Sequence, residues 1–63
     1  MKNLQERYSY YKALDDNGTY ANPYTFDEEM TDLLNKSGLK CNSEEWLEWE
    51  DKILDLGREF LEY

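Results

Sequence analysis

The chain contains no histidine, and Cys41 is the only cysteine among its 63 residues. Histidine is the side chain that most often moves protons near neutral pH and the commonest metal ligand, so its absence removes both roles. It also removes the Ser-His and Cys-His nucleophile pairs of hydrolases. A lone cysteine forms neither an intrachain disulfide nor a cysteine-based zinc site. We therefore predict a protein that is not an enzyme and that holds no metal and no cofactor.

Long apolar stretches are missing too. No run approaches the roughly 18 residues that span a bilayer, and Met1–Arg7 is not followed by the apolar region of a signal peptide. We therefore expect a cytoplasmic protein, in a reducing compartment that suits a single unpaired thiol. Glycine is equally sparse. Because Gly18, Gly38 and Gly57 stand alone, the chain has no glycine-rich phosphate-binding loop.

The chain is short but rich in aromatic residues, with six tyrosines, two tryptophans and two phenylalanines. Its length predicts one small domain, residues 1–63. A domain of this size buries only about 60% of the surface of its unfolded chain, so its margin of stability is thin. Each buried aromatic side chain removes roughly 150–250 Å² from water. An aromatic core is therefore the expected source of stability.

Acidic residues outnumber basic ones by 15 to 7, which gives a net charge of −8. Residues 1–26 are neutral overall, whereas residues 27–63 carry twelve carboxylates against four basic side chains. Such a charge repels nucleic acid phosphates and anionic lipids, so we predict no direct binding to nucleic acid or to membranes. We expect the acidic part of the chain to provide a surface that binds another protein.

The last third of the chain has the pattern of an amphipathic helix over about 43–62. Asn42 followed by Glu45 matches a capping box. Apolar residues then recur at helical spacings and form one wide face: Trp46, Trp49, Ile53, Leu56, Phe60 and Tyr63, flanked by Leu47, Leu54 and Leu61 at seven-residue intervals. Gly57 falls near the middle of that face. Glycine costs roughly 1 kcal/mol there relative to alanine, so we expect another backbone to approach closely.

A second helix is predicted to begin at the capping box that Thr25 and Glu28 form. Its apolar face consists of Phe26, Met30, Leu33 and Leu34. The helix should end at Ser37-Gly38, where glycine suits the left-handed conformation of a helix terminus. Because the connection to the C-terminal helix is short, the two helices should be close neighbours.

Residues 1–24 fit two folds. Asp15-Asp16-Asn17-Gly18 is a turn signal between Tyr8–Leu14 and Thr19–Tyr24, which predicts a tyrosine-rich β-hairpin. The favoured fold is then α+β, with an N-terminal β-hairpin followed by two antiparallel α-helices in the order ββαα. Leu4, Tyr8, Tyr11 and Leu14 also recur with a helical period. The alternative is therefore an all-α three-helix bundle.

Six carboxylates follow one another at spacings of three and four along the predicted C-terminal helix: Glu44, Glu48, Asp51, Asp55, Glu59 and Glu62. Neighbours at those spacings are about 5–6 Å apart, and like charges so placed destabilise a helix by a few tenths of a kcal/mol per pair. Consecutive phosphates of one nucleic acid strand lie on the order of 6–7 Å apart. The row thus has the charge pattern of a phosphate backbone. The alternative is that the acidic surface only keeps a small aromatic protein soluble.

In size, charge and aromatic content, the chain resembles the small acidic proteins of phages and mobile elements that inhibit host nucleic-acid-binding enzymes. This resemblance and the acidic row together predict a non-enzymatic inhibitor. Its partner would be a host or defence protein, whose basic nucleic-acid-binding groove it occupies by nucleic acid mimicry. Besides the six carboxylates of the row, the candidate partner-binding residues are Asp27, Glu28, Asp32, Tyr10 and Tyr20, tyrosine being favoured at interfaces.

A second hypothesis stays open at this point. The chain is then a small homo-oligomeric or antitoxin-like interaction protein, in the simplest case a homodimer. In that hypothesis the aromatic face of the C-terminal helix is the interface between copies, because large exposed apolar faces mark contact sites.

Overall fold

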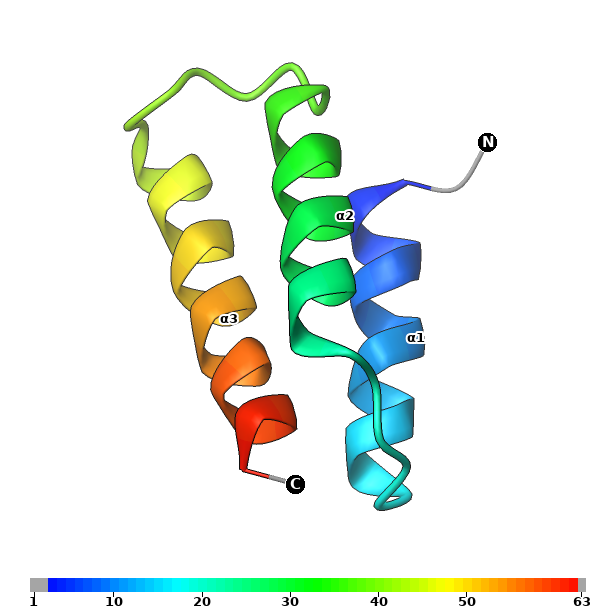
Figure 1. Cartoon of the computed structure of the whole chain (residues 1–63). Helices are drawn as coiled ribbons and strands as arrows, with labels where there is room; N and C mark the ends of the chain where they lie inside the picture. Colours follow the sequence, from blue (N-terminus) through cyan, green and yellow to red (C-terminus); the bar gives the residue numbers. More distant parts are fainter. Residues whose placement is uncertain (1–2, 63) are drawn as a thin grey trace.

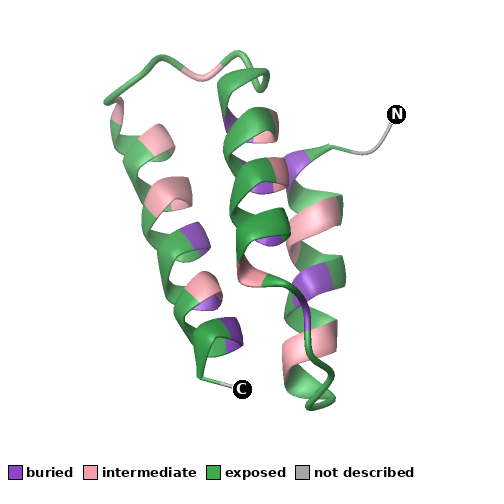
Figure 2. Ribbon diagram, in the orientation of Figure 1, coloured by how far each residue is buried: buried purple, intermediate pink, exposed green. Residues whose placement is uncertain are grey.

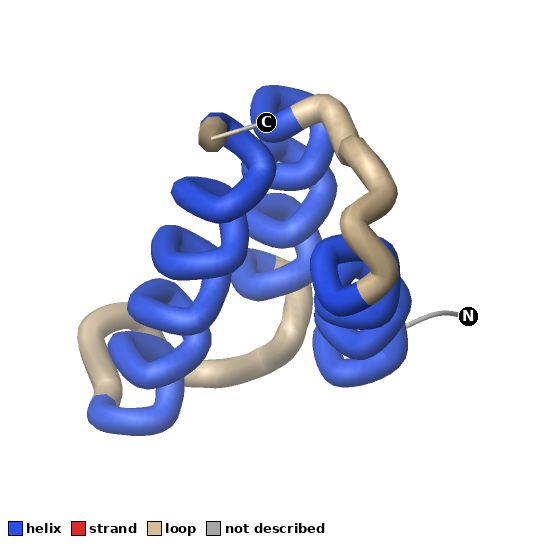
Figure 3. Tube along the Cα trace, turned by 90° about the horizontal axis from the view of Figure 1, so that it is seen from below, coloured by secondary structure: helices blue, strands red, loops and turns tan. Residues whose placement is uncertain are grey.

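The computed structural model describes residues 3–62 and consists of three α-helices (Figure 1). Helix α1 comprises Leu4–Asp16, α2 comprises Pro23–Asn35 and α3 comprises Glu44–Leu61. The α1–α2 and α2–α3 connections lie at opposite ends, so consecutive helices run antiparallel. Seen from below, the helices surround one interior, and no strand occurs in residues 3–62 (Figure 3). The fold is an all-helical bundle.

The predicted N-terminal β-hairpin, and with it the ββαα fold, is wrong, and the three-helix alternative describes the chain. The segment that we expected to form the first strand lies within α1. The Asp15–Gly18 signal does mark a turn, but this turn ends a helix. Gly18 has a φ of +70°, and the Thr19 N–H donates to the carbonyl oxygen of Leu14 at 2.8 Å.

Side-chain periodicity explains why this segment is helical. In a helix, Leu4 and Tyr11 lie on the same side, and both are buried in the core. The alternation of a strand would instead send them to opposite faces. The expected second strand, Thr19–Tyr24, instead forms the end of the α1–α2 connection and the start of α2, where Asn22 is the N-cap and Pro23 occupies the first turn. Proline is favoured there because an N–H group in the first turn has no acceptor within the helix, so proline's lack of an N–H costs no hydrogen bond.

The ends of α2 and α3 lie close to the predicted positions, but their caps differ. The cap of α2 is Asn22 instead of Thr25, and its Oδ1 accepts from the Tyr24 N–H at 2.9 Å. The cap of α3 is Ser43 instead of Asn42, and its Oγ accepts from the Trp46 N–H at 3.3 Å. The predicted left-handed glycine after α2 is confirmed, since Gly38 has a φ of +86°.

Aromatic side chains from all three helices meet in the core, on the inner faces coloured as buried in Figure 2. Phe26 of α2 is fully enclosed, and its ring is edge-on to Tyr11 of α1 and to Phe60 of α3, with centroids 4.9 and 5.4 Å away. Such pairs add about 0.5–1.5 kcal/mol each beyond the burial of their surface. This aromatic cluster of Tyr11, Phe26 and Phe60 therefore joins the three helices at one point.

The predicted apolar face of α3 is largely the side that packs on α1 and α2. Ile53, Leu56 and Phe60 are buried, while Trp46 and Trp49 are partly buried against the core. The Trp49 ring is edge-on to Tyr8 of α1, with a centroid distance of 5.5 Å. Tyr63, the last residue of the predicted face, lies outside the described residues. The three leucines that flank this face, Leu47, Leu54 and Leu61, are exposed.

We had expected another backbone to approach closely at Gly57, and this expectation is wrong. A Cβ built on Gly57 meets only the ring of Phe26, with its nearest atoms at 3.6 and 3.8 Å. These are ordinary van der Waals distances. The glycine therefore faces the aromatic cluster with enough room for one methyl group.

We expect Gly57→Ala to stabilise the protein by about 0.5–1 kcal/mol, because alanine has the higher helix propensity and its methyl group fits against Phe26. Chemical denaturation of the variant and the native protein measures the difference. Gly57→Val is the control, since its additional methyl groups crowd the Phe26 ring and should remove the gain. A loss of stability in Gly57→Ala would contradict the packing described here.

Candidate protein-binding surface

The six carboxylates of the predicted row, Glu44, Glu48, Asp51, Asp55, Glu59 and Glu62, are all exposed along α3 and its C-cap. They lie away from Ile53, Leu56 and Phe60, which face the interior. The outer side of α3 is correspondingly coloured as exposed over its whole length in Figure 2. The helix thus separates its core side from a continuous acidic side, which we call the acidic row.

Most carboxylates of the acidic row have no cationic partner. Within residues 3–62, the single ion pair of the row joins Asp55 to Arg58 at 3.9 Å, and both side chains are largely in solvent. Lys52, also on α3, places its ammonium group over the Trp49 ring, 4.6 Å from the centroid. Exposed pairs contribute only about 0–1 kcal/mol, so the row is close to a bare line of negative charge.

The basic residues of α1 and α2 are engaged by other acids. Lys12 contacts Asp16 at 3.3 Å, and Lys36 contacts Asp32 at 2.9 Å. Arg7 pairs with Glu29 between the two helices. These pairs offset part of the negative charge of α1 and α2, whereas within residues 3–62 most carboxylates of the acidic row have no such partner.

The other predicted acidic residues, Asp27, Glu28 and Asp32, are exposed on α2 but do not form one site. Asp27 lies in the groove between α2 and α3, together with Glu50 and Leu54. Glu28 and Asp32 instead line a shallow hollow formed by α2 residues alone. The structure therefore associates Asp27 with α3 and separates the other two from the α2–α3 groove.

The two predicted tyrosines are exposed, and neither lines the hollow beside Asp55 and Glu59 of the acidic row. Tyr10 lies on α1, and the Arg7 guanidinium carbon is 4.6 Å from the centroid of the Tyr10 ring. Tyr20 belongs to the α1–α2 connection. The tyrosine that does border the row is Tyr8, which lines a hollow of about 350 Å³ with Asp55 and Glu59. The sequence did not distinguish Tyr8 from the others, because its position depends on how α1 packs against α3.

Three exposed leucines of α3 were not identified as site residues from the sequence. Leu47, Leu54 and Leu61 are 43%, 50% and 60% exposed. We had included them in the wide apolar face of the C-terminal helix, and α1 and α2 leave them largely exposed. Their regular seven-residue spacing was the signal, because residues so spaced form a line along a helix. We call this line the leucine ridge.

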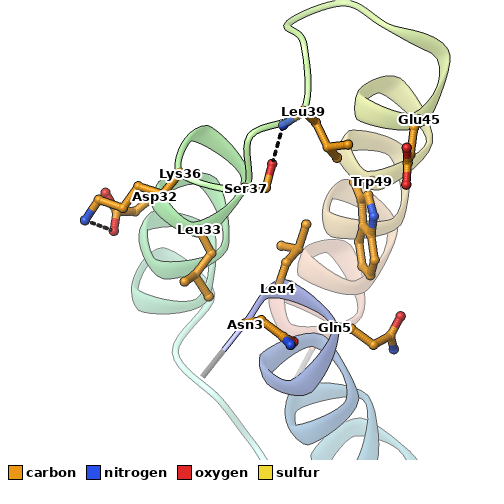
Figure 4. A pocket seen from close by; sticks show the side chains of 10 residues that line it. All are labelled: Asn3, Leu4, Gln5, Asp32, Leu33, Lys36, Ser37, Leu39, Glu45 and Trp49. Carbon is orange, nitrogen blue, oxygen red and sulfur yellow. Dashed lines mark hydrogen bonds and ion pairs between the residues drawn. The ribbon is translucent and has the colours of Figure 1, made fainter. Parts of the chain in front are cut away.

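An apolar pocket of about 530 Å³ opens at the end of the bundle where α1 begins and α2 ends (Figure 4). Leu4, Leu33, Leu39 and Trp49 point toward its centre, and the ion-paired Asp32 and Lys36 point away from it. The volume suits a small apolar group.

The best-connected polar cluster lies between α1 and α2. Glu29 accepts hydrogen bonds from Arg7, one of them at 3.0 Å, and from the Tyr11 hydroxyl at 2.7 Å. The hydrogen bond to Glu29 raises the pKa of the Arg7 guanidinium, and burial followed by the hydrogen bond to Glu29 raises the pKa of Tyr11. The cluster holds α1 against α2 and lies apart from the acidic row.

Other kinds of site find no support in residues 3–62. No group of three or more acidic or cysteine side chains there is arranged to hold a metal ion. Within the same residues, no helix has the length and apolar character needed to cross a membrane. Cys41 is exposed in the α2–α3 connection.

Comparisons with known proteins return no match to a family model, to a curated protein or to a solved structure.

We expect Tyr11→Phe to destabilise the protein by about 1–2 kcal/mol, because Glu29 loses a hydrogen bond from a buried donor. The cost should depend on pH. A tyrosine whose pKa is raised by folding contributes stability that is complete below its unfolded pKa of about 10 and is lost as the pH rises through the folded value. Denaturation from pH 7 to 12 should thus show the difference between native and variant shrinking above pH 10.

Tyr24→Phe is the matched control, because the Tyr24 side chain is 78% exposed. Its removal should have little effect at any pH. A difference between native protein and Tyr11→Phe that stays constant to pH 12 would show that the hydroxyl of Tyr11 is not held by Glu29.

Proposed function

We propose that this protein is a non-enzymatic binding protein whose acidic row occupies the basic nucleic-acid-binding groove of a partner protein. The observation that carries the proposal is the bare charge of α3. Glu44, Glu48, Asp51, Asp55, Glu59 and Glu62 are exposed along one side of the helix, and Asp55 alone has an ion pair within residues 3–62.

The charge spacing of the acidic row is wider than that of a nucleic acid strand but of the same order. From Glu44 to Glu62 the helix rises about 27 Å at about 1.5 Å per residue, so a carboxylate occurs every 4.5–6 Å or so of its axis. One strand of duplex DNA carries a charge about every 3.4 Å. A groove lined with lysine and arginine to bind phosphates can therefore meet several of these carboxylates at once.

The cost of the acidic row also supports a function for it. Like charges three and four residues apart destabilise a helix by a few tenths of a kcal/mol per pair. A domain of this size has little stability to lose. Solubility alone requires net charge but not its alignment on one side of a helix. The alignment is better explained by a partner protein that binds the aligned carboxylates.

The alternative of a homo-oligomer joined through the aromatic face of α3 has less support. Ile53, Leu56 and Phe60 of that face are already buried by α1 and α2 of the same chain. An interface made from them would require the bundle to open.

Reversing two charges of the row tests the proposal. We expect Glu48→Lys with Asp51→Lys to abolish capture of basic nucleic-acid-binding proteins from a bacterial lysate, while circular dichroism shows an intact fold. The fold should survive because both residues are exposed. Proteins captured by the native chain should be released by short duplex DNA and by salt, since about 0.1 M salt screens charges beyond roughly 10 Å.

Glu6→Lys with Asp16→Lys on α1 is the matched control, because it also raises the net charge from −8 to −4 at exposed positions. It should capture the same proteins as the native chain. Equal losses in the two variants would mean that only total charge matters. Captured proteins that duplex DNA does not displace would contradict mimicry.

A further inference from the structure

The leucine ridge is an apolar line that runs beside the acidic row on the exposed surface of α3. Leu47, Leu54 and Leu61 are separated by seven residues, or about 10.5 Å of helix axis per step, and remain 43–60% exposed. Single exposed leucines are ordinary on protein surfaces. Three in register along about 21 Å of one helix provide one of the two apolar positions per seven residues through which a helix packs against a second helix.

The ridge borders a groove that continues onto α2. This groove has a volume of about 240 Å³, and Leu54 lies beside Trp46 and Glu50 of α3 and Asp27 of α2. A side chain from a partner can therefore enter beside Leu54 and contact apolar surface from both helices.

Carboxylates flank the ridge on both sides. With 3.6 residues per turn, Asp51 and Asp55 fall on one side of Leu54, and Glu50 falls on the other. Asp27 of α2 lies on the Glu50 side of the groove. Arg58 is also close to the ridge and pairs with Asp55 at 3.9 Å. An apolar seam with charges along both edges is the arrangement by which paired helices select their partners.

We propose that the leucine ridge and its flanking carboxylates dock a basic amphipathic helix of the partner. The proposal rests on the proposed function and specifies the element of the partner that α3 contacts. Many proteins bind nucleic acid through a helix rich in lysine and arginine. Such a helix lies against the phosphates of the nucleic acid or enters its major groove. The apolar side of such a helix packs on the leucines, and its cations meet Asp27, Glu50 and Asp51.

Charge favours this occupant over a second copy of the chain. Two copies meeting ridge to ridge would bring the flanking carboxylates of both against each other, and each copy carries a net charge of −8. Like charges placed opposite each other oppose association. A nucleic acid is repelled for the same reason.

Two synthetic peptides of 18 residues or so test the inference. Both contain the same leucines, lysines and arginines. In the first, the leucines recur at spacings of three, four and seven, and in the second their order is scrambled so that no apolar side forms. Isothermal titration at about 0.1 M salt should show the native chain binding the amphipathic peptide at least about tenfold more tightly, because only that peptide buries the ridge.

Leu47→Ser with Leu54→Ser should remove that preference and leave binding of the scrambled peptide unchanged. Tyr24→Ser, which changes an exposed apolar residue of α2, should behave like the native chain. If the double variant fails to fold by circular dichroism, Leu61→Ser at the last turn of α3 replaces it and should reduce the preference in part.

The remaining outcomes separate the inference from the proposed function. Equal affinity of both peptides, unaffected by the leucine variants, overturns the inference and leaves the acidic row as a pure charge surface. If Glu48→Lys with Asp51→Lys binds both peptides as tightly as the native chain, the proposed function fails as well. A native dimer in analytical ultracentrifugation that Leu47→Ser with Leu54→Ser dissociates assigns the ridge to a second copy and overturns the inference. Binding of neither peptide also overturns it.

Discussion

The edge-to-face contacts of Phe26 with Tyr11 and Phe60 are the interaction on which the rest of the structure depends. They bring α1, α2 and α3 to one point at centroid distances of 4.9 and 5.4 Å. A chain of 63 residues has no second core to compensate for their loss. Because each helix contributes one side to this cluster, each has another side that stability does not require. On α3 that second side carries the acidic row and the leucine ridge.

The distribution of ion pairs makes the charge a property of one surface. Arg7 pairs with Glu29 across the α1–α2 contact, and Lys12 and Lys36 pair within their own helices. Glu29 of this pair also accepts a hydrogen bond from the Tyr11 hydroxyl, so the Arg7–Glu29 pair is connected to the aromatic cluster. Arg7 thus helps to hold α1 against α2, Lys12 and Lys36 pair locally, and most carboxylates of the acidic row are left in solvent on α3. This division links the fold to the proposed binding of a basic groove.

The sequence predicted the helical elements well where apolar residues recur with a clear helical period. Both α2 and α3 appear as expected, Gly38 has the expected left-handed conformation, and Ile53, Leu56 and Phe60 are buried. The caps are Asn22 and Ser43 instead of the predicted Thr25 and Asn42, because more than one residue of a type that caps helices lies near the start of each helix.

The first helix could not be predicted because its local signals are ambiguous. Asp15–Gly18 is compatible with a hairpin turn and with the end of a helix, and tyrosine is common in strands. Long-range packing determines that this segment is a helix and not a strand, since only a helix buries Leu4 and Tyr11 together. The same limit applies to the site. The spacing of the acidic row was sufficient to place it on one side of α3, but whether Leu54 is covered depends on where α2 lies.

Methyl cross-saturation in nuclear magnetic resonance tests the central claim most directly, which is that the outer side of α3 is a binding surface distinct from the core. The deuterated chain carries protonated leucine methyl groups, and the protons of the bound amphipathic peptide are saturated. The account predicts that Leu47, Leu54 and Leu61 lose intensity while Leu4 and Leu14 of α1 do not. Loss of intensity at α1 or around the apolar pocket, with the three leucines of α3 unaffected, would contradict it.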